Sequence, residues 1–248
     1  MLVTYIYDGS FQGLLTCIYE YYYSDKKAQD IKSERNYEKT LLSEEIVIKS
    51  SEEKSLKVEK AIENKISKEV LKDIYTVFLS EEAGFEMLIL EYVKLGFKIG
   101  VKLRHYLHNP VVLEVSKCVK RVINEVHRLC GFVRFTSLPG EIYYASIEPD
   151  HNILTLLAPH FSARFSNQKW IIHDLKRELA ILQEDGQWVL TVMERGYGER
   201  LAAANSGVYE DLWKSYYKTI SIEERENPKL RRQMMPQRYW KHMTEFRD

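Results

Sequence analysis

The sequence predicts an α+β fold in which an antiparallel sheet is covered by helices and followed by a helical C-terminal tail. Of its 248 residues, 45% are hydrophobic and 12% aromatic, which is enough apolar side chain for a sizeable core. Apolar residues recur every three or four positions in the first half of the chain, and they alternate with polar residues between Phe132 and Val192. Helices followed by strands are typical of an α+β fold.

The first hundred residues are expected to contain two short strands and four helices. Leu2–Tyr7 is rich in β-formers and ends at Asp8-Gly9-Ser10, after which a helix is expected over Phe11–Tyr23. Residues 26–40 are polar and lack apolar periodicity, which favours a connecting segment that can be mobile. Residues 45–49 indicate a second strand. The other expected helices run over Glu53–Ile66, Lys68–Leu79 and Glu81–Ile99.

A long helix is expected to start at Asn109-Pro110, because asparagine can cap free backbone N–H groups and proline needs no donor there. It should end near Cys130. Its buried stripe is predicted to consist of Val112, Val115, Val119, Val122, Val126 and Leu129. A second stripe, with Lys117, Arg121 and Arg128, follows the same spacing on another face. That stripe is either an ordinary solvated surface or a face that follows phosphates.

After Gly131 the pattern changes to a period of two residues. A hairpin is predicted from Phe132–Thr136 and Ile142–Ile147, with a turn at residues 138–140. Residues 152–164 are expected to form a short helix or loop. Three more strands are predicted at Trp170–Asp174, Leu179–Gln183 and Trp188–Val192. The chain should therefore divide into an α+β core at residues 1–193 and a helical extension at residues 194–248.

The charge is unevenly distributed although 36 basic and 36 acidic residues cancel. Residues 94–134 contain nine basic and two acidic residues, a local net charge of +7, and the segment from Lys214 to the end carries +4. Basic surfaces of this kind attract phosphate backbones. Aromatic residues interleave with the basic ones in the tail, either to stack on bases or to dock the tail on the core. The candidate nucleic-acid-binding residues are Lys117, Arg121, Arg128, Arg134, Arg164, Arg231, Arg232 and Arg238.

Several classes of protein are excluded or disfavoured. No apolar run is long enough to cross a membrane, and the first residues lack the basic start of a signal peptide. Three cysteines without a C-x-x-C pair favour a reducing compartment, so a cytoplasmic location is expected. The phosphate-binding glycine motifs are missing, and His105-x-x-His108 lacks further ligands at zinc spacing. We therefore expect neither a metal nor a cofactor.

The densest polar constellation is Glu148-Pro149-Asp150-His151, at the end of a predicted strand, together with Glu125 and His127 on the long helix. Carboxylates beside a histidine can act as acid and base, so Glu148, Asp150, His151 and His127 are candidate catalytic residues. The alternative is a structural turn at a strand end. Asp8 and Ser10 present the same choice, with helix capping favoured.

Motifs along nearly the whole chain resemble those of the bacterial family described as probable DNA metabolism proteins. They include Tyr7-Asp-Gly-Ser-Phe11, Gly131-Phe-Val-Arg-Phe135, Ile147-Glu-Pro-Asp-His151, Ala158-Pro-His-Phe161 with Arg164-Phe165, Trp170-Ile-Ile-His-Asp174 and Met235-Pro-Gln-Arg-Tyr-Trp-Lys241. The residues that carry the resemblance are Asp8, Gly9, Ser10, Trp170, Asp174, Trp213, Arg225, Asn227, Pro236, Tyr239 and Trp240. Of the two adjacent rings Tyr239 and Trp240, one is expected to anchor the tail in the core, with Arg238 on a basic rim.

The resemblance implies a context of DNA repair without supplying catalytic residues. The family is a domain of unknown function that is fused in some chains to a uracil-DNA glycosylase domain, and its genes commonly neighbour one for a radical S-adenosylmethionine protein. A nucleic-acid-binding or adaptor component that works with such a glycosylase-like or radical protein is the first hypothesis, with DNA as partner. An enzyme that acts on DNA by metal-independent acid–base chemistry is the second, and a protein-interaction scaffold without nucleic-acid contact is the third.

Overall fold

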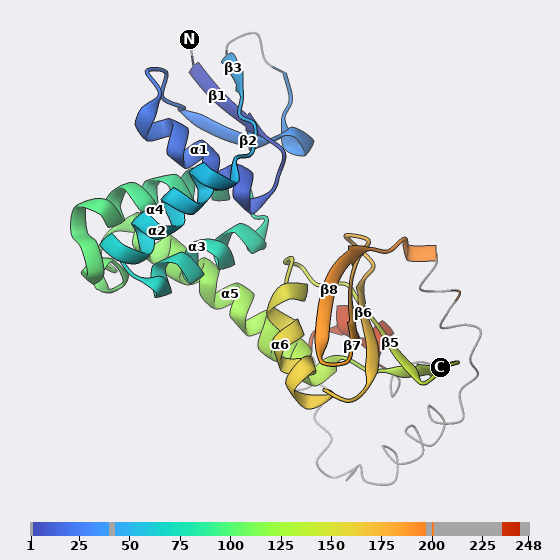
Figure 1. Cartoon of the computed structure of the whole chain (residues 1–248). Coiled ribbons are helices and arrows are strands. Elements are labelled where there is room, and N and C mark those ends of the chain that lie inside the picture. Colours follow the sequence, from blue (N-terminus) through green and yellow to red (C-terminus); the bar gives the residue numbers. More distant parts are fainter. Residues whose placement is uncertain (1, 40–42, 197–199, 201–234, 244–248) are drawn as a thin grey trace. The chain divides into compact units, whose positions relative to one another are not determined.

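The structure of the chain is a computed structural model, in which residues 2–39, 43–196, 200 and 235–243 are described. The chain forms two compact units, Met1–Ile123 and Asn124–Asp248, and each is described by itself (Figure 1). The division falls within a long helix, whereas the sequence predicts one core domain through residue 193. The helical extension expected from residue 194 stays a prediction, because most of its residues lie outside the described part of the chain.

The first unit contains a parallel sheet of three strands, ordered β2-β1-β3. The strand β1 (Leu2–Tyr7) lies in the middle, with five of its six residues buried. The edges are β2 (Asp30–Ser33) and β3 (Ser43–Val47). The expectation that residues 26–40 only connect is wrong, because β2 and the short 3₁₀ helix η1 (Glu34–Asn36) lie there. Ile31 is fully buried and Ala28 is 5% exposed, so two apolar side chains tie this polar segment to the core.

Helices pack beside this sheet as the apolar periodicity predicts (Figure 1). They start at serine caps where the sequence offers them: the side chains of Ser10, Ser51 and Ser67 each accept a backbone N–H bond. The fourth helix begins at Phe85 and not at Glu81, since Glu81 and Gly84 both have positive φ and form a turn. The elements are α1 (Phe11–Tyr23), α2 (Glu52–Lys65), α3 (Lys68–Ser80), α4 (Phe85–Ile99), η2 (Gly100–His105) and α5 (Pro110–Phe132).

The core of the first unit joins the sheet to these helices. Tyr5, Leu14, Ile62, Ile74 and Val93 are fully buried in it. The predicted stripe of α5 is also confirmed where its valines are most buried, at Val112, Val115 and Val122.

The second unit contains a sheet of five strands, ordered β4-β5-β6-β7-β8, beside the helix α6 (Leu154–Arg164). The α+β class is confirmed, with antiparallel hairpins in the predicted region. One pair departs from this pattern: β5 and β6 are parallel, because α6 provides the crossover between them. The strands are β4 (Thr136–Leu138), β5 (Ile142–Ile147), β6 (Lys169–Asp174), β7 (Leu179–Glu184) and β8 (Gln187–Val192).

The first hairpin strand is shorter than predicted. The expected strand over residues 132–136 is wrong except for Thr136, because α5 continues to Phe132 and the amide of Val133 still bonds to the carbonyl of Leu129. Gly131 therefore does not stop the helix. The described part of the C-terminal tail is the 3₁₀ helix η4 (Gln237–His242), which contacts β5.

Candidate functional site

Aromatic rings and lysines gather around the C-terminal end of α1 in the first unit, and we call this group the tyrosine–lysine surface. It consists of the C-terminal half of α1, the loop that follows it, and neighbouring parts of α2 and α4. Lysine ammonium groups lie 5.1 to 5.9 Å from ring centroids, within the range of cation–π attraction. Its members are Tyr19, Tyr21, Tyr22, Tyr23, Phe97, Lys27, Lys54, Lys57, Lys65 and Lys94.

The rings of this surface differ in their contacts and in how far they are open to stacking by a ligand. Two ammonium groups lie near the Tyr21 ring, those of Lys27 at 5.6 Å and Lys94 at 5.1 Å from its centroid. Tyr23 stacks on Tyr19 with centroids 4.4 Å apart, and 74% of Tyr23 remains exposed. A tyrosine supported on one side and open to solvent can accept another flat ring by stacking.

Part of the lysine charge is neutralised on the same surface. Three lysines form ion pairs with glutamates at 2.5 to 2.6 Å: Lys54 with Glu20, Lys57 with Glu53, and Lys94 with Glu91. Within the described part of the chain, Lys27 and Lys65 have no such ion pair. They are the cations best placed to meet a phosphate.

Sequence analysis missed this surface. The signal was present in the run Tyr19-Glu-Tyr-Tyr-Tyr23, which places aromatic rings on every side of the end of a helix. A core needs aromatic residues on one face only, so such a run indicates rings with a role at the surface. Apart from Lys27, which lies in the loop after α1, the lysines come from α2 and α4 and could not be assigned to this surface without the fold.

Helix α5 exposes the predicted basic residues Lys117, Arg121 and Arg128. Arg121 is held in place, since its guanidinium donates to both carboxylate oxygens of Glu82 at 2.9 and 2.6 Å and to Glu114 at 3.3 Å. These bonds raise the pKa of Arg121 above its ordinary value. Its charge is therefore offset by two acids, Glu82 and Glu114.

A buried carboxylate organises the second unit. Glu125, 3% exposed, accepts hydrogen bonds from the amides of Asp150 and His151 at 2.9 and 3.0 Å, and from the Tyr239 hydroxyl at 2.5 Å. His151 Nδ1 lies 2.5 Å from Oε2, the same oxygen that accepts the His151 amide, whereas the Asp150 amide and the Tyr239 hydroxyl bond to Oε1. Burial acts to raise the pKa of Glu125, but these bonds outweigh it and hold the pKa at about 2. We call this group, with Arg238, the Glu125 cluster.

The Glu125 cluster joins two predicted motifs, because Asp150 and His151 come from one and Arg238 and Tyr239 from the other. Tyr239 is the anchoring ring, 2% exposed, whereas Trp240 is half-buried and donates to the carbonyl of Met235. Arg238 forms an ion pair with Asp150 at 2.6 Å and keeps 47% of its side chain exposed. An anchor and a partly exposed cation are thus found where they were expected.

The candidate catalytic residues have different partners and surroundings. Glu148 forms ion pairs with Arg195, at 3.2 Å, and with Lys241. Despite partial burial, these cations hold the pKa of Glu148 below its usual range. His127 is exposed on α5. A carboxylate already paired with cations is a poor general base.

The remaining predicted basic residues have mixed surroundings. Arg134 donates to the carbonyl oxygens of Gly131 and Val133 and so closes the end of α5. Arg164 is exposed, with its guanidinium 5.6 Å from the ring centroid of Phe165. Arg231 and Arg232 lie outside the described residues.

The motif residues near the start form a capped turn. Asp8 accepts bonds from the amide and hydroxyl of Ser10 and from the Ser50 hydroxyl, and Ser10 caps α1. Gly9 has a φ of 83°, which suits glycine. The capping interpretation of Ser10 is confirmed.

The later motif residues are structural where they are described. Trp170 is buried against Phe161, and Asp174 is fully buried and paired with Arg177 at 3.0 Å. Pro236 immediately precedes η4. Trp213, Arg225 and Asn227 lie outside the described residues.

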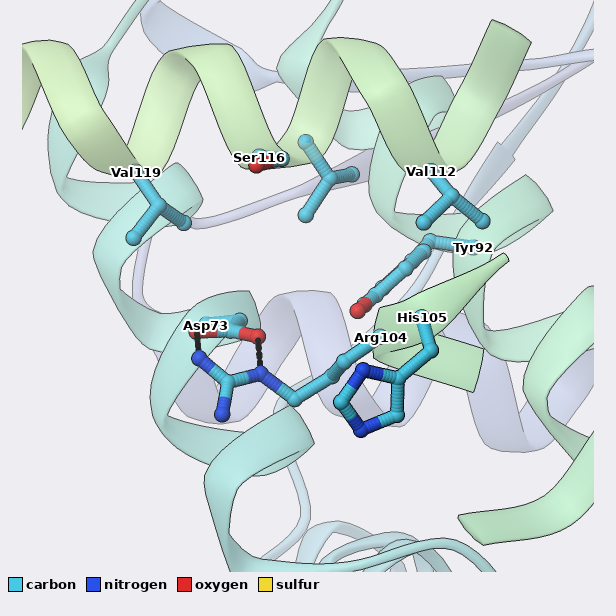
Figure 2. Close-up of a pocket in the computed structure, with 8 residues that line it drawn as sticks. Asp73, Tyr92, Arg104, His105, Val112, Ser116 and Val119 are labelled. Carbon is cyan, nitrogen blue, oxygen red and sulfur yellow. Dashed lines mark hydrogen bonds and ion pairs between the residues drawn. The ribbon is translucent and has the colours of Figure 1, made fainter. Parts of the chain in front are cut away.

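A pocket of about 300 Å³ opens in the first unit between α3, α4, η2 and α5 (Figure 2). Asp73, Tyr92, Arg104 and His105 line it together with residues of α5. One sequence signal for this pocket went unnoticed: Asp73 lies between Val70 and Ile74 on the buried side of α3, where an acid needs a partner.

Comparison with protein families gives one match, to a domain of unknown function, DUF4130, over residues 83–245. The match covers more than half of the chain. The chain belongs to the DUF4130 family. Comparison with curated proteins and with solved structures gives no match.

The DUF4130 match contains the whole Glu125 cluster and both α4 and α5. The strands of the first sheet and the helices α1 to α3 precede it. The tyrosine–lysine surface and the pocket thus combine residues inside the DUF4130 match, such as Tyr92 and Phe97, with residues before it. Among the described residues, no group of histidine, cysteine or carboxylate side chains could hold a metal ion, and no helix could span a membrane.

Proposed function

We propose that this chain binds single-stranded DNA as a component of DNA repair or DNA metabolism, and that it presents the strand to a glycosylase-like or radical S-adenosylmethionine partner. The observation that carries the proposal is the open ring of Tyr23, stacked on Tyr19, whose own ring has the ammonium groups of Lys54 and Lys57 within 5.6 and 5.9 Å. Stacking platforms beside cations are how proteins bind single strands without reading sequence.

The contacts of the acidic residues support binding over catalysis. Both oxygens of Glu125 accept hydrogen bonds, and Glu148 is paired with Lys241 and Arg195. A carboxylate with a pKa of about 2 accepts a proton only weakly at neutral pH. These groups hold the second unit together, which leaves the cationic surfaces as the best candidates for contact with DNA.

The test is a binding titration of the full chain against single-stranded, duplex and uracil-containing DNA over a range of salt concentrations. The single strand should bind most tightly, with affinity falling as salt rises. Tyr23→Ala should weaken binding by about tenfold, because removing a stack costs about 1 to 3 kcal/mol. The double change Lys27→Gln and Lys65→Gln should reduce the salt slope by about 0.7 for each phosphate that is no longer neutralised.

Lys72→Gln provides the matched control, since Lys72 is an exposed lysine of the same unit on α3, outside the surface. It should leave the salt slope and the affinity nearly unchanged. A wild-type chain that shows no salt-dependent binding to any of the three DNAs would overturn the proposal. So would equal effects of the Lys72 and the Lys27/Lys65 changes.

A further inference from the structure

The pocket of the first unit has two unlike walls. The side chains of Val112 and Val119 project from α5 on one side (Figure 2), and Val115 of the same helix also lines the pocket. On the other side Arg104 donates to Asp73 through Nε at 2.8 Å and Nη2 at 3.4 Å. The space between an apolar wall and a planar ion pair suits a flat ligand, because guanidinium groups and valines both pack well against ring faces.

The charges of the pocket also restrict the ligand. Asp73 and Arg104 offset each other, so the pair has no excess charge to attract a phosphate or a carboxylate. Small-molecule sites of this kind are mostly apolar, with a few polar groups that orient the ligand. The ligand should therefore be an uncharged ring with polar atoms on its edge.

One polar group of the pocket is available to bond to the polar edge of such a ligand, the hydroxyl of Tyr92. Tyr92 is 1% exposed, and its hydroxyl points into the pocket toward Asp73 and Arg104 (Figure 2). Among the described residues no hydrogen-bond partner is found for this hydroxyl. The pocket reaches this hydroxyl, so a ligand can bond to it in place of water, and a hydrogen bond of this kind contributes about 0.5 to 1.5 kcal/mol. Ser116, exposed at the mouth on α5, offers a second hydroxyl.

We infer that this pocket binds a nucleobase, held between the α5 valines and the Asp73–Arg104 pair with its polar edge on the Tyr92 hydroxyl. A nucleobase is flat and uncharged, and it carries donors and acceptors on its edge, so it meets each of the three requirements. The choice of a base over other flat heterocycles rests on the proposed function, in which the chain meets DNA. The base can come from a free nucleoside or from a single strand.

The experiment has two arms, one for each source, and both use the full chain. In the first, adenosine, guanosine, cytidine and thymidine are titrated separately by calorimetry. In the second, a strand of about 12 nucleotides with a single 2-aminopurine reports burial of that base by its fluorescence. Wild type, Tyr92→Phe and Tyr106→Phe are compared in both arms. Tyr106 is an exposed tyrosine of the same unit outside the pocket.

We expect binding in at least one arm for wild type and Tyr106→Phe, weakened about tenfold or more in Tyr92→Phe. The melting temperature of Tyr92→Phe should not fall, because the hydroxyl that it removes has no partner to lose. Ser116→Phe, at an exposed position, should block the mouth and weaken binding without relying on a core substitution. No binding in either arm, or equal binding by wild type, Tyr92→Phe and Ser116→Phe, would overturn the inference.

The outcomes separate this inference from the proposed function. If strands bind through Tyr23 with the same affinity and fluorescence in Tyr92→Phe, and nucleosides do not bind, the proposed function stands and the pocket inference falls. If nucleosides bind through Tyr92 while no strand binds, the pocket inference stands and the proposed function falls.

Discussion

Glu125 is a buried residue that stays ionised because its surroundings replace the water it has lost. Two backbone amides, a histidine and a tyrosine hydroxyl face its oxygens. Charge-assisted bonds of this kind are roughly twice as strong as neutral ones. The same bonds make the residue a source of acid sensitivity, because a protonated Glu125 could not accept all of them.

We predict that Glu125 contributes stability that is complete above its ordinary pKa of 4.5 and is lost as the pH falls toward its folded pKa of about 2. A difference of this size corresponds to about 3 kcal/mol in the free energy of unfolding. Urea unfolding from pH 7 down to pH 2 measures it. Glu125→Gln should be less stable at pH 7 and should lack this part of the acid loss.

Glu184→Gln is the control for the Glu125 change. Glu184 lies in the same unit at the surface, 62% exposed, and pairs with Lys169. Exposed pairs contribute little, so this variant should follow the wild-type pH profile. A Glu125→Gln profile parallel to wild type would contradict the role given to the cluster.

Helix α1 is positioned by a glycine in its first turn. A Cβ on Gly13 would lie 2.4 Å from Oδ1 of Asp8, 2.8 Å from Oγ of Ser50 and 2.9 Å from Cδ2 of Tyr7. Asp8 cannot move away freely, because Ser10 and Ser50 both donate to it. The turn after β1 therefore depends on the absence of a side chain at this position.

We predict that Gly13→Ala destabilises the chain by more than about 1 kcal/mol, although alanine is the better helix former by about that amount. The comparison is Gly131→Ala in α5, where an added Cβ meets nothing within 4 Å and should stabilise by up to about 1 kcal/mol. Denaturant unfolding of both variants measures whether each change lowers or raises the free energy of unfolding. A stabilised Gly13→Ala chain would show that the Asp8 turn yields easily.

The exposed basic residues of α5 lead to a prediction about DNA binding. Replacing Lys117, Arg121 and Arg128 together by glutamine should lower both DNA affinity and its salt slope. Arg121 should contribute the least, because Glu82 and Glu114 already offset its charge. Single variants measured beside the triple variant give that order. Unchanged affinity and slope in the triple variant would make this face an ordinary solvated surface.

The sequence predicts the elements of the whole molecule better than the contacts between them. The bounds of α1 and β5 agree because each follows a local period, of 3.6 or 2 residues. The strand β2 was not predicted, because it lies in a polar segment and forms by pairing with β1, which leaves no local pattern in the sequence. The Asp73–Arg104 pair joins residues 31 apart, and Glu125 and Tyr239 are 114 apart. Such pairs depend on the fold and have no pattern in the sequence.

At the scale of the two compact units, we predict that damage to the Glu125 cluster stays in the second unit. Tyr239→Ala should lower its stability by about 3 kcal/mol or more and speed amide exchange in β5 and β6, with little change in residues 2–123. Exchange mass spectrometry resolves the units. Arg238→Ala removes a partly exposed member of the cluster, which pairs with Asp150 and donates to the Tyr239 hydroxyl, and it should speed exchange less than Tyr239→Ala does. Faster exchange throughout both units would show that the chain opens as one cooperative body.

The hydrogen bond from Tyr239 to Glu125 also has a consequence for biosynthesis. A ribosome delivers the chain from its N-terminus, so the Glu125 carboxylate emerges more than a hundred residues before the tyrosine that covers it. Until then the nascent second unit lacks this anchor, whereas the whole of the first unit, residues 1–123, has already been synthesised. Ribosomes stalled shortly before Tyr239 should therefore carry a protease-resistant first unit and a protease-sensitive second one.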